Sequence, residues 1–384
     1  MKPSPESSRR RLESFAAYLG EQGLDLGLVY DRYNLCYLTG FLRPSAGVGE
    51  MKFPLLLVFP DREPVLLVNR GFQDLARETW QGEMIVYNCS DIHYKMVTYP
   101  EDAVALLRDY LISQRLSVRR LGAEERYLIL AYYRLFADLY PQAEWQDLSG
   151  ELQRRRACKD EDEIALIRRA GELVDLGYRV VKEASVAGTT EIEVYNAANA
   201  AVHREVGTFT FFLGDFASGE RSVAGGGPAT DRVLREGETF ICDLWATVHG
   251  YWADTCRTFV AGGKPTREQR KMHDVVLRAM GAGEALLRPG TRCAEVYRAI
   301  YEVFAAEGWD EHFSHHAGHG IGLHPHEAPF FIPASEEALE PGMTVTLEPG
   351  VYLPAYGSGV RCEDNYLITE EGFERLTHFP RGLT

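Results

Sequence analysis

A cluster of histidines and glycines toward the carboxyl end of the chain contains the residue types that metal binding or proton transfer requires. Six of the eleven histidines fall between His312 and His326. Neutral imidazole binds divalent transition metals, and its charge changes near neutral pH. An exposed histidine-rich loop would have a similar composition, but Gly318 and Gly320 flank His319 and allow backbone conformations that other residues avoid. The pattern therefore favours His319 as a metal ligand that the backbone holds in place.

Two aspartates fall on consecutive predicted strands. Asp243 and Asp254 lie at equal distances from a tight turn centred on Val248 and His249, so we expect them to face each other directly. Directly opposed residues have Cβ atoms about 4.5 to 5.5 Å apart. Two carboxylates at that separation repel each other unless a proton or a cation lies between them.

A second pair of acids repeats this arrangement, because Glu348 and Glu363 flank a longer turn at 354–358. Acids on exposed strand positions would need no cation, but the neighbours of both pairs are apolar: Ile241, Leu244, Trp245, Trp252, Val345, Leu347, Val351 and Tyr352. A bare carboxylate is costly in such surroundings. We therefore expect the four acids and His319 to bind two divalent ions about 3.5 to 4 Å apart. Such ligands suit manganese, cobalt, iron or zinc better than copper.

The composition of the chain excludes several classes of protein. A net charge of -15 disfavours nucleic acid and anionic membranes as partners. We find no run of about 18 apolar residues that could span a bilayer. Residues 1–8 lack the apolar segment of a secretory signal, and seven scattered cysteines form no metal-binding or disulfide pattern. These features predict a cytoplasmic protein.

The 384 residues allow two domains, which we place at 1–152 and 153–384, with the polar tract 147–159 as a linker. The first part alternates strands and helices, as an α/β domain does. We expect its helices at 9–23, 103–113 and 126–137, and its strands at 24–30, 53–59, 64–69, 84–87 and 120–123. The second part has the order helix, helix, strand, strand twice. We expect its helices at 160–184, 190–206, 267–287 and 294–307, and its strands at 239–248, 250–260, 344–353 and 360–369.

Several motifs together resemble the pita-bread (creatinase/aminopeptidase) metallopeptidases, and most closely their proline-specific branch, which contains Xaa-Pro dipeptidase (prolidase) and aminopeptidase P. The motifs are Asp243, 250–258, 318–329, 341–343, 348–350 and 360–364. The segment 34–41 is similar to part of a creatinase-type amino-terminal domain. The resemblance implies an α/β creatinase-type domain followed by an α+β pita-bread catalytic domain with pseudo-twofold duplication.

The resemblance also implies a role for individual residues. Five would bind two metal ions: Asp243, Asp254, His319, Glu348 and Glu363. Glu348 would act as the general base toward the attacking water, and His326 would contact the substrate and steady the tetrahedral intermediate. His315 matches a further pocket histidine, and Arg361 matches an arginine that braces the acids.

The activity implied by the resemblance is metal-dependent hydrolysis of the bond between an amino-terminal residue and a following proline, in dipeptides or short peptides, by a homodimer. One alternative is a hydrolase of a small non-peptide amide, as in ectoine-hydrolysing or creatinase-like relatives. Another is a non-catalytic relative that binds proteins. The complete set of five ligands favours an enzyme over the non-catalytic alternative.

The chain departs from the family pattern in the glycine-rich connection before the first aspartate. Family members usually have a substrate-contacting histidine roughly 17 residues before Asp243, where this chain has Gly225–Gly227, and no histidine occurs between His203 and His249. Cys256 stands where the family commonly has threonine. We expect its thiol to pack on the same face as Asp254, since side chains two residues apart on a strand share a face.

A second departure concerns the free carboxylate of a dipeptide. Prolidases typically bind it with an additional arginine shortly before the last glutamate, but this chain has no other arginine between Tyr352 and Arg361. A preference for dipeptides alone would therefore need an anchor from elsewhere, such as Arg221, Arg43 or the amino-terminal domain of a partner subunit.

Overall fold

The computed structural model describes residues 4–41, 54–88 and 100–383, and the chain divides into two compact units, Lys2–Arg156 and Ala157–Thr384. The boundary predicted between residues 152 and 153 would fall inside helix α6 (Ser149–Ala157). The boundary between the two units falls within the tract 147–159 that we expected as a linker, but most of this tract is helical. Glu151 pairs with Arg154 and Arg155 at 2.9 and 2.6 Å. Pairs at these spacings stabilise helices.

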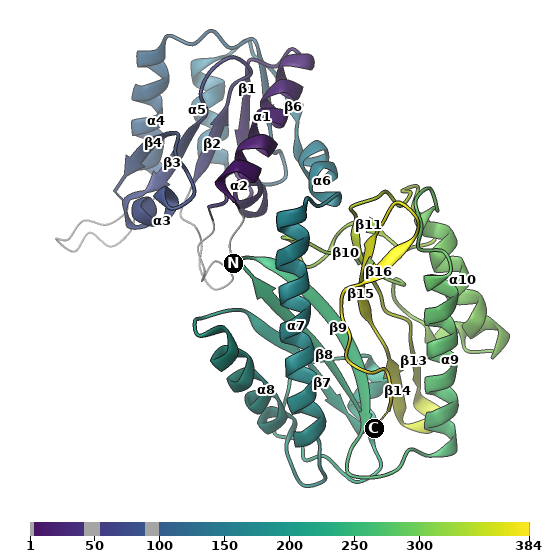
Figure 1. The fold of residues 1–384 in the computed structure, drawn as a ribbon. Coiled ribbons are helices and arrows are strands. Elements are labelled where there is room, and N and C mark those ends of the chain that lie inside the picture. Colours follow the sequence, from purple (N-terminus) through teal and green to yellow (C-terminus); the bar gives the residue numbers. More distant parts are fainter. Residues whose placement is uncertain (1–3, 42–53, 89–99, 384) are drawn as a thin grey trace. The chain divides into compact units, whose positions relative to one another are not determined.

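The amino-terminal unit is the predicted α/β domain. Its mixed six-stranded sheet has the order β4-β3-β2-β1-β5-β6 (Figure 1). The strands are β1 (Leu26–Val29), β2 (Leu55–Val58), β3 (Val65–Asn69), β4 (Glu83–Tyr87), β5 (Arg120–Ala123) and β6 (Glu144–Asp147). The helices are α1 (Pro5–Glu21), α2 (Arg32–Thr39), α3 (Gln73–Arg77), α4 (Pro100–Gln114) and α5 (Leu130–Leu139), besides α6. Every residue of the three central strands β1, β2 and β3 is buried, as expected for apolar strands covered on both faces.

The first half of the carboxyl-terminal unit consists of two helices and a three-stranded antiparallel sheet, β7-β8-β9. Its elements are α7 (Glu161–Ala184), α8 (Glu191–Val206), β7 (Phe212–Ser218), β8 (Thr239–Val248) and β9 (Tyr251–Val260). Capping boxes formed by Asp160 with Glu163 and by Thr190 with Glu193 begin the two helices, because each pair satisfies amide groups that a helix start leaves unbonded. Strand β7 was not predicted.

The second half repeats the order of two helices followed by strands, which confirms the predicted order. The helices are α9 (Arg267–Glu284) and α10 (Cys293–Ala306). The strands are β10 (His319–Gly320), β11 (Glu327–Phe330), β12 (Thr344–Leu347), β13 (Gly350–Leu353), β14 (Ser358–Arg361), β15 (Asp364–Ile368) and β16 (Phe373–Arg375). They form a sheet of order β11-β10-β12-β15-β16 and the separate pair β13-β14.

Two strands that we predicted as continuous are each broken. The range 344–353 divides into β12 and β13, and the range 360–369 divides into β14 and β15. Pro349 lies in the first gap and has no amide hydrogen to continue a ladder. Strand β12 therefore pairs with β15, whereas β13 pairs with β14. The breaks fall at Glu348 and Glu363, which leave the regular ladders at these points.

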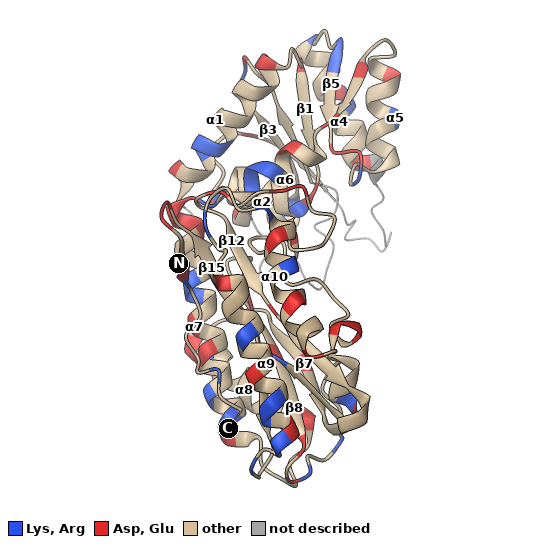
Figure 2. Ribbon diagram, turned by 90° about the vertical axis from the view of Figure 1, so that its right-hand side faces the viewer, with Lys and Arg blue, Asp and Glu red and all other residues tan. Residues whose placement is uncertain are grey.

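The helices of the carboxyl-terminal unit carry charged residues of both signs. Figure 2 shows Lys and Arg interspersed with Asp and Glu along helices α7, α9 and α10. Within the described ranges, no helix combines the length and the apolar character needed to cross a bilayer.

Candidate metal centre

The hairpin of β8 and β9 carries the first two acids, in a register that differs from our prediction. Its two-residue turn is His249-Gly250, with φ values of 47° and 83°. Turns with positive φ at both positions match the twist of a hairpin, and glycine favours the second position. Asp243 therefore faces Cys256, and Asp254 faces Trp245. The expected direct opposition of the two aspartates was wrong, but the offset of two residues keeps both on one face of the sheet.

The second pair of acids lies just beyond the paired strands β13 and β14. Gly350 pairs with Arg361, so Glu348 and Glu363 lie at equal distances outside that pair. The amide of Glu348 donates to the carbonyl of Ala317 at 3.0 Å, and the amide of Glu363 donates to the carbonyl of Cys256 at 2.9 Å. The second hydrogen bond joins the two halves of the unit directly beside Asp254.

All five predicted ligands converge in one place. Oxygen atoms of Asp243, Asp254 and Glu363 lie within 4.8 Å of one another, and so do ligand atoms of His319, Glu348 and Glu363. Glu363 belongs to both groups. Two groups that share one carboxylate have the arrangement that two neighbouring ions with a bridging ligand require.

His319 is oriented with one nitrogen toward the acids. Its Nδ1 lies 2.9 Å from the carbonyl oxygen of Gly320, and its Nε2 lies 3.5 Å from Glu348 Oε1 and 3.8 Å from Asp254 Oδ2. Burial lowers the pKa of His319 to about 4, so the ring is neutral at pH 7. A neutral imidazole that donates through Nδ1 presents a free electron pair on Nε2 to a metal.

Two carboxylates of the site each keep a buried oxygen with no hydrogen-bond partner in the described part of the chain. These atoms are Asp254 Oδ1 and Glu363 Oε1. Burial, and then repulsion by the neighbouring acids, raises the pKa of Asp254 and of Glu363 well above the ordinary range. Unpaired buried carboxylate oxygens are costly. The donor set of oxygens and one imidazole nitrogen therefore fits divalent metal ions.

Glu348 differs from the other acids because histidines surround it. His316 Nδ1 lies 3.1 Å from its Oε1, and His315 Nδ1 lies 3.8 Å from its Oε2. Burial by itself would raise the pKa of Glu348, but the contact with His316 and the charge of that ring, whose own pKa is raised, outweigh burial and lower the pKa of Glu348 to about 2. Glu348 is therefore anionic at neutral pH.

The remaining predicted site residues line the same pocket, which has a volume of about 420 Å³. Arg361 is buried, pairs through Nη2 with Asp243 Oδ2, and donates through Nη1 to the Tyr352 hydroxyl at 3.0 Å. The other side of that hydroxyl meets His315 Nε2 at 2.9 Å. The ring of His326 stacks obliquely on that of His319, with centroids 4.0 Å apart.

Sequence reasoning missed three side chains of this site. His316 contacts Glu348, the Tyr352 hydroxyl links Arg361 to His315, and Asp215 lines the pocket from β7. We had treated Tyr352 only as an apolar neighbour. Membership in the histidine cluster was the one signal that could have indicated His316.

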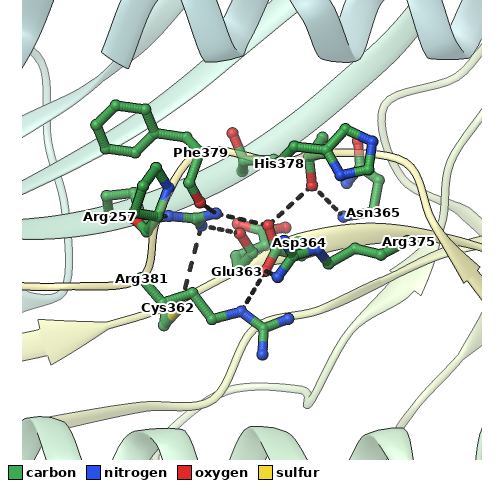
Figure 3. Close-up of polar contacts among 12 residues, drawn as sticks. Arg257, Cys362, Glu363, Asp364, Asn365, Arg375, His378, Phe379 and Arg381 are labelled. Atoms are coloured by element: carbon green, nitrogen blue, oxygen red, sulfur yellow. Dashed lines mark hydrogen bonds and ion pairs between the residues drawn. The ribbon is translucent and has the colours of Figure 1, made fainter. Parts of the chain in front are cut away.

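A second group of buried charges lies behind Glu363, as Figure 3 shows. The guanidinium of Arg257 donates to the carbonyl oxygens of Cys256 and Glu363 and, at 2.6 Å, to Asp364 Oδ1. Arg381 donates to Asp364 Oδ2 at 2.6 Å. Arg257 thus holds the backbone on both sides of the site without entering the pocket.

Comparisons with known proteins place the chain among peptidases. The model of metallopeptidase family M24 matches residues 165–370, and that of the creatinase/prolidase amino-terminal domain matches residues 11–158. The chain is 29% identical over 373 residues to an uncharacterized peptidase of Bacillus subtilis, covering 97% of this chain and 99% of that one. It is 28% identical over 376 residues to the Xaa-Pro dipeptidase of Lactobacillus delbrueckii subsp. lactis, covering 97% and 98%.

Solved structures give the same result for the fold. The prolidase from Pyrococcus horikoshii OT3 superposes with a TM-score of 0.83 at 25% identity, over 98% of this chain and 100% of that one. The agreement confirms the predicted fold class, an α/β creatinase-type domain followed by an α+β pita-bread domain.

Proposed function

Because the chain belongs to metallopeptidase family M24, we propose that it hydrolyses the bond between an amino-terminal residue and a following proline, in dipeptides or short peptides. The observation that carries the proposal is the convergence of four buried acids and a neutral histidine, with two carboxylate oxygens left unpartnered among the described residues. The similarity to a relative named Xaa-Pro dipeptidase supports the choice of substrate.

Five residues would hold two divalent ions: Asp243, Asp254, His319, Glu348 and Glu363. When bound, two such ions supply Lewis acidity and make water nucleophilic at neutral pH. Manganese, cobalt and zinc all suit this donor set.

The other side chains act on the substrate and the proton. Glu348, held anionic by its histidines, accepts a proton from the attacking water. The exposed ring of His326 contacts the substrate and steadies the tetrahedral intermediate, and His315 lines the same pocket. Arg361 fixes the carboxylate of Asp243 through their ion pair.

The setting of the enzyme is also a proposal. We assign it to the cytoplasm, which agrees with six described cysteines that have free thiols. We propose a homodimer that acts on peptides and has neither nucleic acid nor membrane as a partner. The domains would be 1–152 and 153–384.

The test is release of proline from an Xaa-Pro dipeptide by protein reconstituted with manganese, cobalt or zinc. Glu348→Gln removes the proposed base and should lower kcat by about 10² to 10⁴-fold, the usual contribution of a general base. Glu371→Gln removes the same charge from an exposed position and should leave turnover unchanged. A metal-loaded wild type that releases no proline would contradict the proposal and favour a non-peptide amide.

A further inference from the structure

Asp215 is an acid of the pocket that the proposed reaction does not use. It lies on β7 opposite Asp243 and lines the pocket. It belongs to none of the groups of ligand atoms that could hold an ion among the described residues. Within the same part of the chain, its carboxylate accepts no hydrogen bond and forms no ion pair. Asp215 therefore presents an uncompensated negative charge to whatever occupies the pocket.

The Asp215 carboxylate lies against the glycine loop, in space that the absence of a side chain at Gly226 leaves open. A Cβ atom added at Gly226 would lie 2.1 Å from Asp215 Oδ2, so the carboxylate fills the space where a side chain of residue 226 would begin. The loop is held on both sides of that point. The amide of Phe216 donates to the carbonyl of Gly227 at 2.8 Å, and Arg361 Nη1 donates to the carbonyl of Gly225 at 2.6 Å.

The described pocket offers no free cation to balance Asp215 or to bind a substrate carboxylate. Arg361, its one described lining residue with a permanent positive charge, is committed to Asp243, Gly225 and Tyr352. Arg221, which we had considered as a carboxylate anchor, pairs with Glu191 and donates to the carbonyls of Phe216 and Pro228 at 3.0 and 2.8 Å. Arg43 lies outside the described residues.

We propose that Asp215 is a specificity-determining residue that disfavours a free carboxylate after the proline and favours a neutral group with N–H donors there. This inference rests on the proposed function. A carboxylate accepts hydrogen bonds and repels a second carboxylate, whereas an amide donates to it. A pocket of this size keeps the charges of a dipeptide within one Debye length of Asp215, about 10 Å at 0.1 M salt. The preferred substrates are therefore peptides that continue beyond the proline, or proline amides, over free Xaa-Pro dipeptides.

The test compares Met-Pro with Met-Pro-amide, which differ only in the carboxyl group, and measures the methionine that both release. Manganese-loaded wild type should have the higher kcat/KM for the amide. Asp215→Asn keeps the shape of the side chain and removes its charge. It should therefore lower the ratio of kcat/KM for Met-Pro-amide to kcat/KM for Met-Pro by about tenfold, a typical effect of one nearby charge. Asp231→Asn removes a charge from an exposed position of the same unit and should leave the ratio unchanged.

Two further measurements keep the inference separate from the proposed reaction. Gly226→Ala retains the charge but must displace the carboxylate, so it should shift the ratio in the same direction. Calorimetric binding of proline and of prolinamide to the manganese-loaded protein gives the same comparison without turnover. The role of Asp215 would be overturned if Asp215→Asn left unchanged either the kcat/KM ratio of amide to acid or the affinity ratio of prolinamide to proline. A wild type that cleaves neither peptide contradicts the proposed function, while the binding ratio still decides the inference.

Discussion

Glu363 and Asp364 are adjacent, equally buried acids with opposite surroundings. Asp364 is 0% exposed, and both of its oxygens are bonded, to Arg257 and Thr377 on one side and to Arg381 on the other. Glu363 is 1% exposed, and its Oε1 has no partner among the described residues. Arginine side chains thus pair with Asp364, whereas Oε1 of the adjacent Glu363 has no partner among the described residues.

The consequence is visible in the pKa of each acid. Burial would raise the pKa of Asp364, but the charges of Arg257 and Arg381 outweigh it and lower that pKa. For Glu363, burial and the nearby acids Asp254, Glu348 and Asp243 act together and raise the pKa. Burial alone therefore does not identify a metal site. A metal site is distinguished by a group of buried acids that no side chain neutralises, so that a bound cation must do so.

We call Asp254 and Glu363 the unpaired group, because each keeps a buried oxygen without a partner among the described residues. We call Asp364 and its arginines the paired group. The largest effect is expected from removing an acid of the unpaired group. Glu363→Gln should abolish binding of at least one ion and lower kcat/KM by more than about 100-fold, the upper end of what loss of an outer-shell partner costs. The metal-free variant should be at least as stable as metal-free wild type, because one source of repulsion is removed. Metal content by mass spectrometry and amide exchange in β9 measure the two effects. A variant that keeps two ions per chain would contradict this account of the site.

The convergence of the four acids of the metal centre could be predicted from the sequence because it follows from local rules. Short turns relate Asp243 to Asp254 and Glu348 to Glu363, and the apolar neighbours indicate burial. The turn was predicted at Val248 and His249 but lies one residue later, at His249-Gly250, because Gly250 readily adopts the positive φ that this turn requires. The face was still correct, because a shift of the turn by one residue changes the register by two.

The paired group is expected to give the next largest effect, on stability. Asp364→Asn leaves the buried Arg257 without its anion and removes one of the two anions of the half-buried Arg381, and breaking a buried ion pair costs about 3 to 5 kcal/mol. Native-state amide exchange in β15 should report this loss in the metal-free protein. Asp231→Asn, at an exposed position, is the matched control and should change stability by less than about 0.5 kcal/mol. Equal stabilities of Asp364→Asn and wild type would remove the distinction between the two groups.

Such a network could not be predicted from one sequence. Arg257 and Asp364 are 107 residues apart, and no spacing or periodicity relates them. Asp215 was missed for a related reason, because β7 has no clear alternation: its first residue and its last three are buried, whereas the three between them are exposed or half-buried. His316 and His315 lie in an irregular segment, where neither the helical nor the strand period assigns a direction to a side chain.

Metal addition should raise the free energy of unfolding, by an amount per ion that lies between the effects expected for Asp364→Asn and for Tyr352→Phe. At a free manganese concentration of 100 times Kd, wild type should gain about 2.7 kcal/mol for each ion that binds, because the ions bind the folded state alone. A chelator should reverse the gain. Asp364→Asn should retain it, whereas Glu363→Gln should lose most of it, as measured by calorimetric unfolding with and without metal. A gain of equal size in both variants would place the ions outside the unpaired group.

The smallest effect is expected at Tyr352, which joins the acid cluster to the histidines without belonging to the paired network. Its hydroxyl meets His315 Nε2 at 2.9 Å and accepts from Arg361 Nη1 at 3.0 Å. Tyr352→Phe keeps the packed ring and removes both contacts, so it should lower the free energy of unfolding by about 2 kcal/mol, about 1 kcal/mol for each hydrogen bond lost. Because Arg361 keeps its ion pair with Asp243, metal content should stay at the wild-type level while kcat falls less than tenfold, the decrease that corresponds to about 1.4 kcal/mol. Loss of an ion in Tyr352→Phe would instead show that Asp243 depends on the hydroxyl for its position, and that the unpaired group extends to the histidine side of the pocket.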